Sequence, residues 1–319
     1  MKTVTILIPT YNEQAVLAPL YKRLTALANN NKKYNFEFLF INDGSTDNTL
    51  SIIKNYAKTD TRISYVNLSR NFGKEPAMLA GFDYTTGDAT VIIDADLQDP
   101  PELIPKMISY WEDGYDDVYA KRRSREGESW FKKKSSSIFY KLLQKSTNVD
   151  IQVDTGDFRL LDKRAINALR EIRESQRYTK GMFSWIGFNK KEITYDRDPR
   201  AAGETKWNYP KLINLAIDGI TSFTTAPLRI ASLAGIFISL FAFIFIFIII
   251  SKTIIFGDPV AGWPSTMAAI LFLGGVQLLS IGIIGEYIGR IFNEVKARPV
   301  YFVEEYHHGK KPVKKSSKN

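Results

Sequence analysis

Two uncharged apolar stretches near the C-terminus constrain this chain more than any other feature. Residues Ile230 to Ser251 carry no charge, Ile236 to Ile250 are almost wholly Ile, Phe and Leu, and Pro264 to Gly285 are again free of charge. A helix that crosses a bilayer core needs about 20 apolar residues. A helix buried in a soluble core normally keeps a polar stripe, which the first stretch lacks. The sequence therefore predicts a hairpin of two membrane-spanning helices within residues 229–291.

The flanking charges predict how this hairpin is oriented. Arg229 precedes the first stretch, whereas Arg290 and the lysine-rich residues 292–319 follow the second. The connecting residues 252–263 carry one Lys and one Asp. Positively charged flanks stay on the cytoplasmic side, and the N-terminus shows no apolar region of a signal peptide. We therefore expect both termini and the large N-terminal region in the cytoplasm, on a multi-pass protein of the cell membrane.

Composition excludes several other classes of protein. The chain is 24% charged and 45% hydrophobic, values that rule out a disordered or collagen-like chain. It has no cysteine, so disulfides, thiolate metal sites and a cysteine nucleophile are excluded. The 43 basic and 34 acidic residues give a net charge of +9, which attracts nucleic acid, anionic lipid or phosphorylated substrates. The apolar stretches favour the last two and argue against nucleic acid.

Short apolar runs alternate with segments of helical spacing over the first 120 residues. Strands are expected at residues 4–9, 36–41, 63–68, 90–93 and 117–120, and helices at 15–29, 51–58, 75–84 and from 102. This alternation is typical of β-α-β units, which build a mostly parallel sheet covered by helices. The fold class predicted for this region is therefore α/β.

Polar residues follow three of the expected strands, beginning at Pro9, Asn42 and Asp94. Ligands of open α/β sheets bind beyond the carboxyl ends of the strands. No dinucleotide-binding or P-loop glycine motif follows the first strand. Asp94 and Asp96 could together ligate Mg²⁺ or Mn²⁺, which share coordination with substrate phosphates. An acidic turn that caps the helix at Glu102 is the alternative, and the other polar strand ends favour the metal.

Six motifs, spread over nearly the whole chain, carry a family resemblance. They are Ile8–Glu13 (IPTYNE), Asn42–Asp47 (NDGSTD), Asn71–Lys74 (NFGK), Asp94–Pro101 (DADLQDPP), Asp154–Arg159 (DTGDFR) and Gly203–Trp207 (GETKW). Together they resemble the family 2 glycosyltransferases of the GT-A fold, and within them the polyprenyl-phosphate enzymes: dolichol-phosphate mannose synthase and the bactoprenol glucosyltransferases. The hairpin and Gly285–Arg290 are also similar to the bactoprenol group.

The resemblance implies a role for each matching residue. The nucleotide-sugar pocket would be formed by Pro9, Tyr11, Glu13, Asp43, Lys74, Asp94, Ala95 and Asp96. A Mg²⁺ or Mn²⁺ ion with the diphosphate would be held by Asp94, Asp96 and Gln98. The acceptor phosphate would be received by Arg122, Arg200 and Lys206. Asp157, with Asp96, would be catalytic.

The chemistry of a phosphate acceptor changes what Asp157 is expected to do. A phosphate monoester has a second pKa of about 6, so at neutral pH it is already a competent nucleophile. We therefore expect Asp157 to orient a substrate, through Arg159 or a neighbouring basic residue, rather than to remove a proton. A structural turn or helix cap is the alternative. At the membrane surface we expect the basic run Arg122 to Lys134, with Trp130 and Phe131, for which a solvated charged face is the alternative. We also expect an interfacial helix over residues 207–223, for which a helix packed in the core is the alternative.

These inferences divide the chain into a cytoplasmic GT-A domain (1–206), an interfacial helix or linker (207–228), two transmembrane helices (229–291) and a basic cytoplasmic tail (292–319). The resemblance implies an inverting transfer of a sugar from a nucleotide-diphosphate sugar to undecaprenyl (polyprenyl) phosphate, for cell-envelope glycan modification. UDP-glucose is the first choice of donor, and N-acetylhexosamine or mannose donors stay open. It also implies a homo-oligomer and a flippase partner.

Two alternatives lie outside this reaction. A processive polysaccharide synthase would carry a Gln-x-x-Arg-Trp signature and more spans, but none of the five Trp residues here follows an Arg. A non-catalytic membrane protein that binds nucleotide sugars would not need the intact set Asp94, Asp96, Asp157 and Lys206. Both alternatives are therefore disfavoured.

Overall fold

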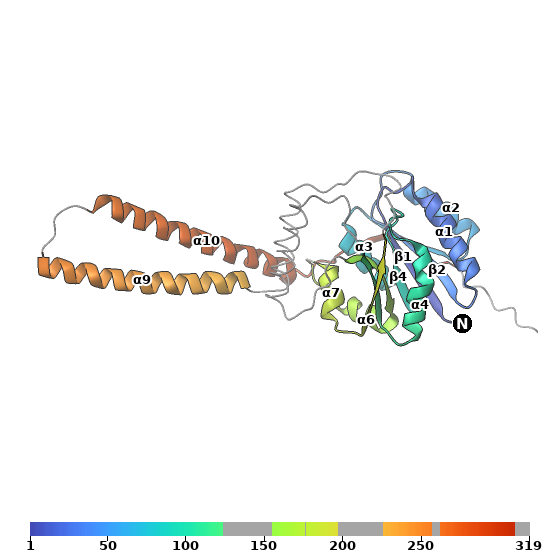
Figure 1. Ribbon diagram of the computed structural model, residues 1–319. Coiled ribbons are helices and arrows are strands. Elements are labelled where there is room, and N and C mark those ends of the chain that lie inside the picture. The colour runs from blue at the N-terminus through green and yellow to red at the C-terminus, as the bar shows by residue number, and fades with distance from the viewer. Residues whose placement is uncertain (124–154, 176, 197–225, 257–261, 310–319) are drawn as a thin grey trace, which may run out of the picture. The chain divides into compact units, whose positions relative to one another are not determined.

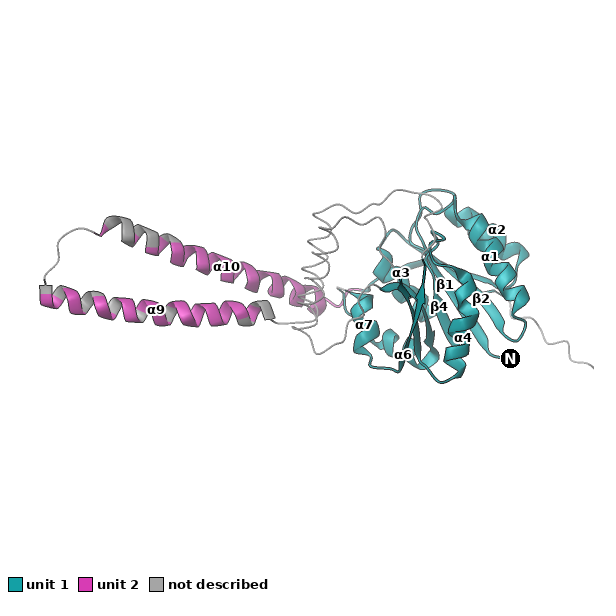
Figure 2. Ribbon diagram, in the orientation of Figure 1, with its two compact units in different colours: residues 1–214, 299–319 teal, residues 215–298 magenta. Residues whose placement is uncertain are grey.

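The computed structural model describes residues 1–123, 155–175, 177–196, 226–256 and 262–309 (Figure 1). Arg200, Lys206, the loop with Trp130 and Phe131, and the helix expected over residues 207–223 lie outside the described residues. The chain divides into two compact units, Met1–Asn214 with Pro299–Asn319, and Leu215–Arg298 (Figure 2).

The described strands of the first unit form one sheet of eight strands in the order β7-β5-β6-β4-β1-β2-β3-β8. Their bounds are β1 Thr3–Thr10, β2 Asn35–Asn42, β3 Ile63–Leu68, β4 Ala89–Ile92, β5 Asp117–Arg122, β6 Thr155–Asp162, β7 Lys190–Tyr195 and β8 Val303–His307. The pairs β1–β2, β1–β4, β2–β3 and β5–β7 are parallel. The pairs β3–β8, β4–β6 and β5–β6 are antiparallel. The α/β class with a mostly parallel sheet is confirmed.

Helices cover both faces of this sheet (Figure 1). Their bounds are α1 Leu17–Asn30, α2 Thr49–Thr59, α3 Lys74–Tyr84, the 3₁₀ turn η1 Pro101–Leu103, α4 Ile104–Glu112, α6 Lys163–Glu171 and α7 Thr179–Trp185. Alternate side chains of β1 point to opposite faces, so Ile6 joins the core under α1, α2 and α4, while Leu7 meets α3. A Cβ on Gly81 of α3 would lie 2.3 Å from Leu7. Glycine at this position therefore lets α3 pack directly on β1.

Three strands of the sheet were not predicted from the sequence. β6 lies between β4 and β5 and runs antiparallel to both, and β7 adds the edge beside β5. β8 lies within the segment expected to be a basic tail, and it pairs with β3 from more than 230 residues away. The pairing of these three strands joins parts of the chain that are distant in sequence, so no local sequence pattern predicts it.

The second unit consists, in its described part, of α9 (Ala226–Phe256) and α10 (Trp263–Val295). The two apolar stretches of the sequence fall inside these helices. Within the described residues, one segment of α10, Phe272–Val295, is long and apolar enough to cross a bilayer. Its mean hydropathy is 1.4, and the most apolar part of the segment is not buried against the rest of the protein. Large apolar side chains on α9, among them Phe237 and Phe247, are also largely exposed. These exposed surfaces are those of a membrane-associated unit.

Candidate active site

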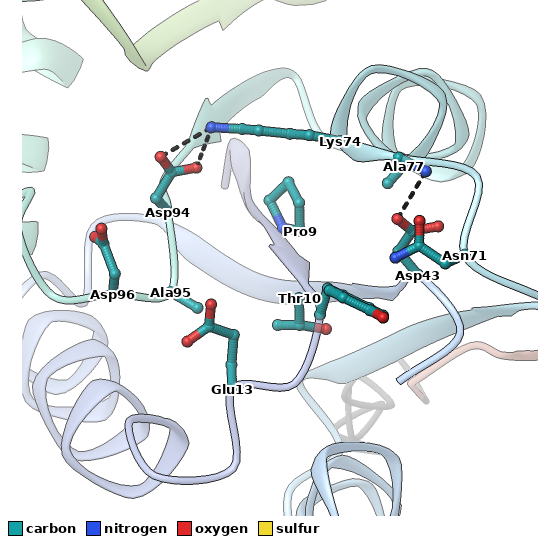
Figure 3. Close-up of a pocket in the computed structure, with 12 residues that line it drawn as sticks. Pro9, Thr10, Glu13, Asp43, Asn71, Lys74, Ala77, Asp94, Ala95 and Asp96 are labelled. Carbon is teal, nitrogen blue, oxygen red and sulfur yellow. Dashed lines mark hydrogen bonds and ion pairs between the residues drawn. The ribbon is translucent and has the colours of Figure 1, made fainter. Parts of the chain in front are cut away.

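A cleft of about 260 Å³ opens at the carboxyl ends of β1, β2 and β4, beside the start of α3 (Figure 3). The residues that line it are Pro9, Thr10, Tyr11, Glu13, Asp43, Asn71, Gly73, Lys74, Ala77, Asp94, Ala95 and Asp96. All eight residues predicted to bind the nucleotide sugar are in this set. The cleft also includes Thr10, Asn71, Gly73 and Ala77, which no motif role had singled out.

Asp43 is held rigidly at the end of β2. Its two carboxylate oxygens accept hydrogen bonds from the backbone N–H groups of Phe72 (2.7 Å) and Gly73 (2.9 Å). Burial is the largest influence on this group and raises the pKa of Asp43, against the effect of the two N–H donors. Gly44 has φ +62°, and a Cβ there would lie 2.3 Å from the carbonyl carbon of Arg70. Glycine is therefore required where these two loops meet.

The loop after β1 is locked against the loop after β2. Asn12, at φ 56°, accepts a hydrogen bond from the backbone of Thr46 (2.8 Å), and its own N–H donates to Ser45 Oγ (2.9 Å). The N–H of Glu13 donates to Thr49 Oγ1 (2.8 Å). Polar side chains that bond neighbouring backbone stabilise this kind of turn. The two sequence motifs that begin at Pro9 and Asn42 thus form one wall of the cleft.

Lys74 bridges two carboxylates at the other wall. Its Nζ lies 2.7 and 2.9 Å from the two oxygens of Asp94 and 2.6 Å from Oδ2 of Asp157; Figure 3 shows the contacts with Asp94. Burial disfavours the charge of Lys74, but Asp157 and Asp94 outweigh it and hold the pKa of Lys74 above its ordinary value. The Lys74 side chain is 43% exposed, so its ammonium group is accessible from the cleft.

Asp157 lies on β6 and is 12% exposed. Burial alone would raise the pKa of this carboxyl, but Lys74 first and then Lys180 hold it well below its usual range. Arg159, the partner expected from the sequence, is instead bound to Asp117 at 2.9 Å, with both side chains almost fully buried. Its guanidinium stacks 3.7 Å from the ring centre of Phe183. Asp157 is therefore paired with Lys74, the first residue of helix α3, and the charge of Arg159 adds a smaller favourable effect.

The turn after β4 presents Asp94 and Asp96 on the same loop (Figure 3). Leu97 has φ 64°, an unfavourable conformation for leucine that makes the chain turn sharply there. The N–H of Gln98 donates to Asp96 Oδ1 (3.2 Å), and Gln98 Oε1 is buried without a hydrogen-bond partner among the described residues. Gln98 is not one of the residues that line the cleft.

This donor set fits a divalent cation that is shared with a substrate. Within the part of the chain that the structure describes, no three Asp, Glu, His or Cys side chains converge on one point. The carboxylates of Asp94 and Asp96, on one loop, would supply part of the shell of Mg²⁺ or Mn²⁺, whose remaining positions are commonly filled by water and phosphate. The residues therefore suit a metal that binds together with a diphosphate.

Arg122 is the last residue of β5 and lies beside Gly156 of β6, whose side-chain direction is opposite to that of Asp157. Its Nη2 would be 3.6 Å from a Cβ placed on Gly156, so the guanidinium is beside the residue that precedes Asp157. Near it, the hydroxyl of Tyr195 donates to Asp99 Oδ1 (2.5 Å), and burial together with Asp99 raises the pKa of Tyr195 well above its ordinary value. Tyr195 was not predicted, because β7 is joined to this region only by tertiary structure.

Comparison with known proteins matches two families. Residues 5–170 match the family described as glycosyl transferase family 2, and residues 226–291 match the GtrB C-terminal hairpin. The chain is 48% identical to an uncharacterized glycosyltransferase of Synechocystis sp., over 94% of both chains. It is 44% identical to the bactoprenol glucosyl transferase of Shigella phage SfX and to the prophage bactoprenol glucosyl transferase homolog of Escherichia coli K12, each over 94% of this chain and 98% of the relative.

Solved structures show a more distant likeness. Glucosyl-3-phosphoglycerate synthase from Mycobacterium tuberculosis, in complex with Mn²⁺, UDP-glucose and phosphoglyceric acid, aligns with a TM-score of 0.45 at 16% identity. The alignment covers 67% of this chain and 76% of that one.

Proposed function

The chain belongs to glycosyl transferase family 2 and is a glycosyltransferase, and from this premise we propose that it transfers glucose from UDP-glucose to undecaprenyl (polyprenyl) phosphate at the membrane. The full-length similarity to bactoprenol glucosyl transferases supports the substrate pair. The hairpin similarity and the exposed apolar surface of α10 support a lipid acceptor. The product would feed a cell-envelope glycan.

The structural observation that carries this proposal is the Lys74 bridge. It links Asp94, on the loop suited to a metal and diphosphate, with Asp157 on β6. A donor diphosphate at Asp94 and a sugar or acceptor at Asp157 would therefore lie beside the same lysine. Arg122, on the neighbouring strand β5, is proposed from the family resemblance to receive the acceptor phosphate. Arginine suits the acceptor because its planar guanidinium donates two parallel hydrogen bonds to phosphate.

The described residues support an inverting displacement. An acceptor phosphate oxygen forms a bond to the anomeric carbon, while the bond from that carbon to the β-phosphate oxygen breaks and its electron pair leaves with the nucleoside diphosphate. Asp43 and Tyr11 would hold the nucleotide, Lys74 would stabilise the leaving diphosphate, and Asp157 would orient the sugar or acceptor. Bound at Asp94 and Asp96, a Mg²⁺ or Mn²⁺ ion would supply further positive charge to the leaving group.

The finer membrane arrangement is also a proposal. We infer that α9 and α10 both span the bilayer and that both termini are cytoplasmic, because the basic residues flank the outer ends of this hairpin. The chain has no native cysteine, so single cysteines can be labelled without background. With an impermeant thiol reagent on intact cells, Ser265→Cys should react and Ser316→Cys should not. The reverse pattern would contradict the orientation.

The decisive test of function is a donor screen. Purified full-length protein is mixed with undecaprenyl phosphate, Mg²⁺ or Mn²⁺ and one of UDP-glucose, UDP-N-acetylglucosamine or GDP-mannose. The product is identified by mass spectrometry. A lipid-linked hexose from UDP-glucose alone is the expected result. Product from another donor would replace the sugar in the proposal, repeated addition of sugars would indicate a processive synthase, and no transfer from any donor would indicate a binding protein. A homo-oligomer and a flippase partner remain predictions.

A further inference from the structure

The segment that follows α10 returns to the sheet of the first unit. It is residues 299–309, and it lies outside both matched ranges, 5–170 and 226–291. Its strand β8 pairs antiparallel with β3, and the N–H of Ser69 donates to the carbonyl of Phe302 (3.0 Å) just before the strand. No motif in the sequence assigned a role to this segment beyond its charge.

One line of contacts runs from this segment to Asp43 through an aromatic pair. The rings of Phe302 and Phe72 lie 6.4 Å apart, and the guanidinium of Arg70 stacks on the Phe72 ring at 4.0 Å. The N–H of the same Phe72 donates to Asp43, as described above. Phe302 therefore packs against the residue that fixes one carboxylate oxygen of Asp43.

A second line of contacts runs through two amides. Glu304 accepts a hydrogen bond from Asn67 Nδ2 (2.8 Å), and Asn67 Oδ1 accepts one from Asn42 Nδ2 (2.7 Å). Asn67 and Asn42 are both buried, and Asn42 directly precedes Asp43. An amide whose two ends are both bonded is fixed in one orientation, and a buried donor left unpaired is costly.

We propose that Phe302 and Glu304 are positioning residues for the donor nucleotide, because Phe302 holds the loop of residues 69–73, Glu304 holds Asn42 through Asn67, and both lines lead to Asp43. The inference rests on the proposed function, since it takes the ligand of the Asp43 cleft to be a nucleoside diphosphate. It makes the nucleotide site dependent on the chain that leaves the membrane hairpin. The site is therefore complete only when residues 299–309 are seated on β3.

The neighbouring residue Glu305 provides a matched control. It accepts hydrogen bonds from Tyr65 (2.6 Å) and Lys54 (2.5 Å), so it fastens the same strand to β3 and α2. Neither contact leads to Asp43. If both glutamates only fastened β8 to the sheet, alanine at either position would disturb the Asp43 site equally. If Glu304 positions Asp43, alanine at Glu304 should disturb that site more than alanine at Glu305.

Hydrogen exchange tests the inference without reference to any substrate. Full-length wild type and the variants Phe302→Ala, Glu304→Ala and Glu305→Ala are purified, and exchange of the backbone amides of residues 42–43 and 69–73 is followed by mass spectrometry. Because Glu304 is exposed, alanine there leaves no cavity. Exchange should accelerate in Phe302→Ala and Glu304→Ala but not in Glu305→Ala. The conservative variants Phe302→Tyr and Glu304→Gln, which retain a ring and an acceptor oxygen, should restore the wild-type rate.

Nucleotide binding supplies the second measurement. By calorimetry with UDP and Mn²⁺, Phe302→Ala and Glu304→Ala should weaken binding about two- to tenfold, the range of one net hydrogen bond. Glu305→Ala should bind as wild type, even if its unfolding temperature falls further. Equal exchange and affinity in the Glu304 and Glu305 variants would overturn the inference and leave the proposed function standing. If wild type binds neither UDP nor GDP, the proposed function fails as well.

Discussion

Replacing Asp157 with asparagine tests whether this carboxylate takes a proton or orients a substrate. The ion pair with Lys74, at 2.6 Å, and the further charge of Lys180 hold the pKa of Asp157 well below its usual range. A base is effective when its pKa lies near the working pH, so Asp157 is a poor base in this setting. We expect Asp157→Asn to lower the turnover number by a similar factor at every pH from 6 to 9.

The size of that factor follows from the contact that is lost. Asparagine keeps an oxygen that can accept from Lys74, but it removes the charge from a site that is only 12% exposed. A hydrogen bond to a charged group contributes about 1.5–3 kcal/mol, which is roughly tenfold to somewhat over a hundredfold in rate. The pKa of Asp157 is lowered in the folded state, so its stabilisation of the fold is complete above its unfolded pKa, about 4, and is lost as the pH falls through the folded value. Between pH 6 and 9 this contribution is constant, so the difference in stability between wild type and Asp157→Asn adds no pH dependence to the comparison.

The assay is turnover against pH at saturating donor, acceptor and metal, for wild type, Asp157→Asn and the control Asp60→Asn. Asp60 pairs with Arg62 (2.7 Å) before the start of β3, away from the cleft, so its loss should leave turnover unchanged. Any acid limb should follow the acceptor phosphate, with a pKa of about 6, and should persist in Asp157→Asn. A wild-type acid limb at a different pKa that vanishes in the variant would refute the orienting role and establish a general base.

Three further predictions concern the metal and the acceptor. Asp96→Asn should insert and fold normally but lose turnover, because an amide lacks the charge that the cation requires. Full activity of this variant, or wild-type activity that EDTA does not reduce, would contradict the metal assignment. Lys74→Met should bind Mn²⁺ at least about tenfold more tightly in the absence of nucleotide, because Lys74 competes directly with the metal for Asp94. The affinity is measured by electron paramagnetic resonance, and an unchanged value would show that Lys74 does not compete. Arg122→Ala should raise the polyprenyl phosphate requirement about ten- to a hundredfold while UDP affinity in calorimetry stays near wild type; a matching loss of UDP affinity would place Arg122 at the diphosphate instead.

The sequence predicted the central part of the fold because its signals there are local. The strand at 63–68 was predicted with its observed bounds, and the others around the cleft were within two residues. Short apolar runs and helix spacing are properties of neighbouring residues, and they were sufficient to predict β1 to β4. The placement of Pro9, Asp43 and Asp94 in one cleft followed from the rule that parallel strands end at the same edge.

The contacts that were missed connect distant parts of the chain. Nothing local to Asp157 shows that its strand inserts between β4 and β5, and only that insertion brings it to Lys74, 83 residues earlier. Arg159 looked like the natural partner because it is two residues away on the same strand. Arg159 is bound to Asp117 and stacks on Phe183, and its charge still favours the ionised form of Asp157 and lowers the pKa of that carboxyl. The pairing of β8 with β3 likewise has no local signal.

The charge of the cleft makes donor and metal depend on each other. Of the cleft-lining residues that the structure describes, four are carboxylates (Glu13, Asp43, Asp94 and Asp96) and one, Lys74, is a cation. A diphosphate that enters alone meets an excess of negative charge, and a metal that enters alone must displace Lys74 from Asp94. Bound together, a metal held by Asp94 and Asp96 would offset the charge of the diphosphate, and Lys74 would be released from Asp94 to contact the leaving group. By linkage, each ligand must then raise the affinity of the other by the same factor, so the cleft favours the metal–nucleotide complex over either component.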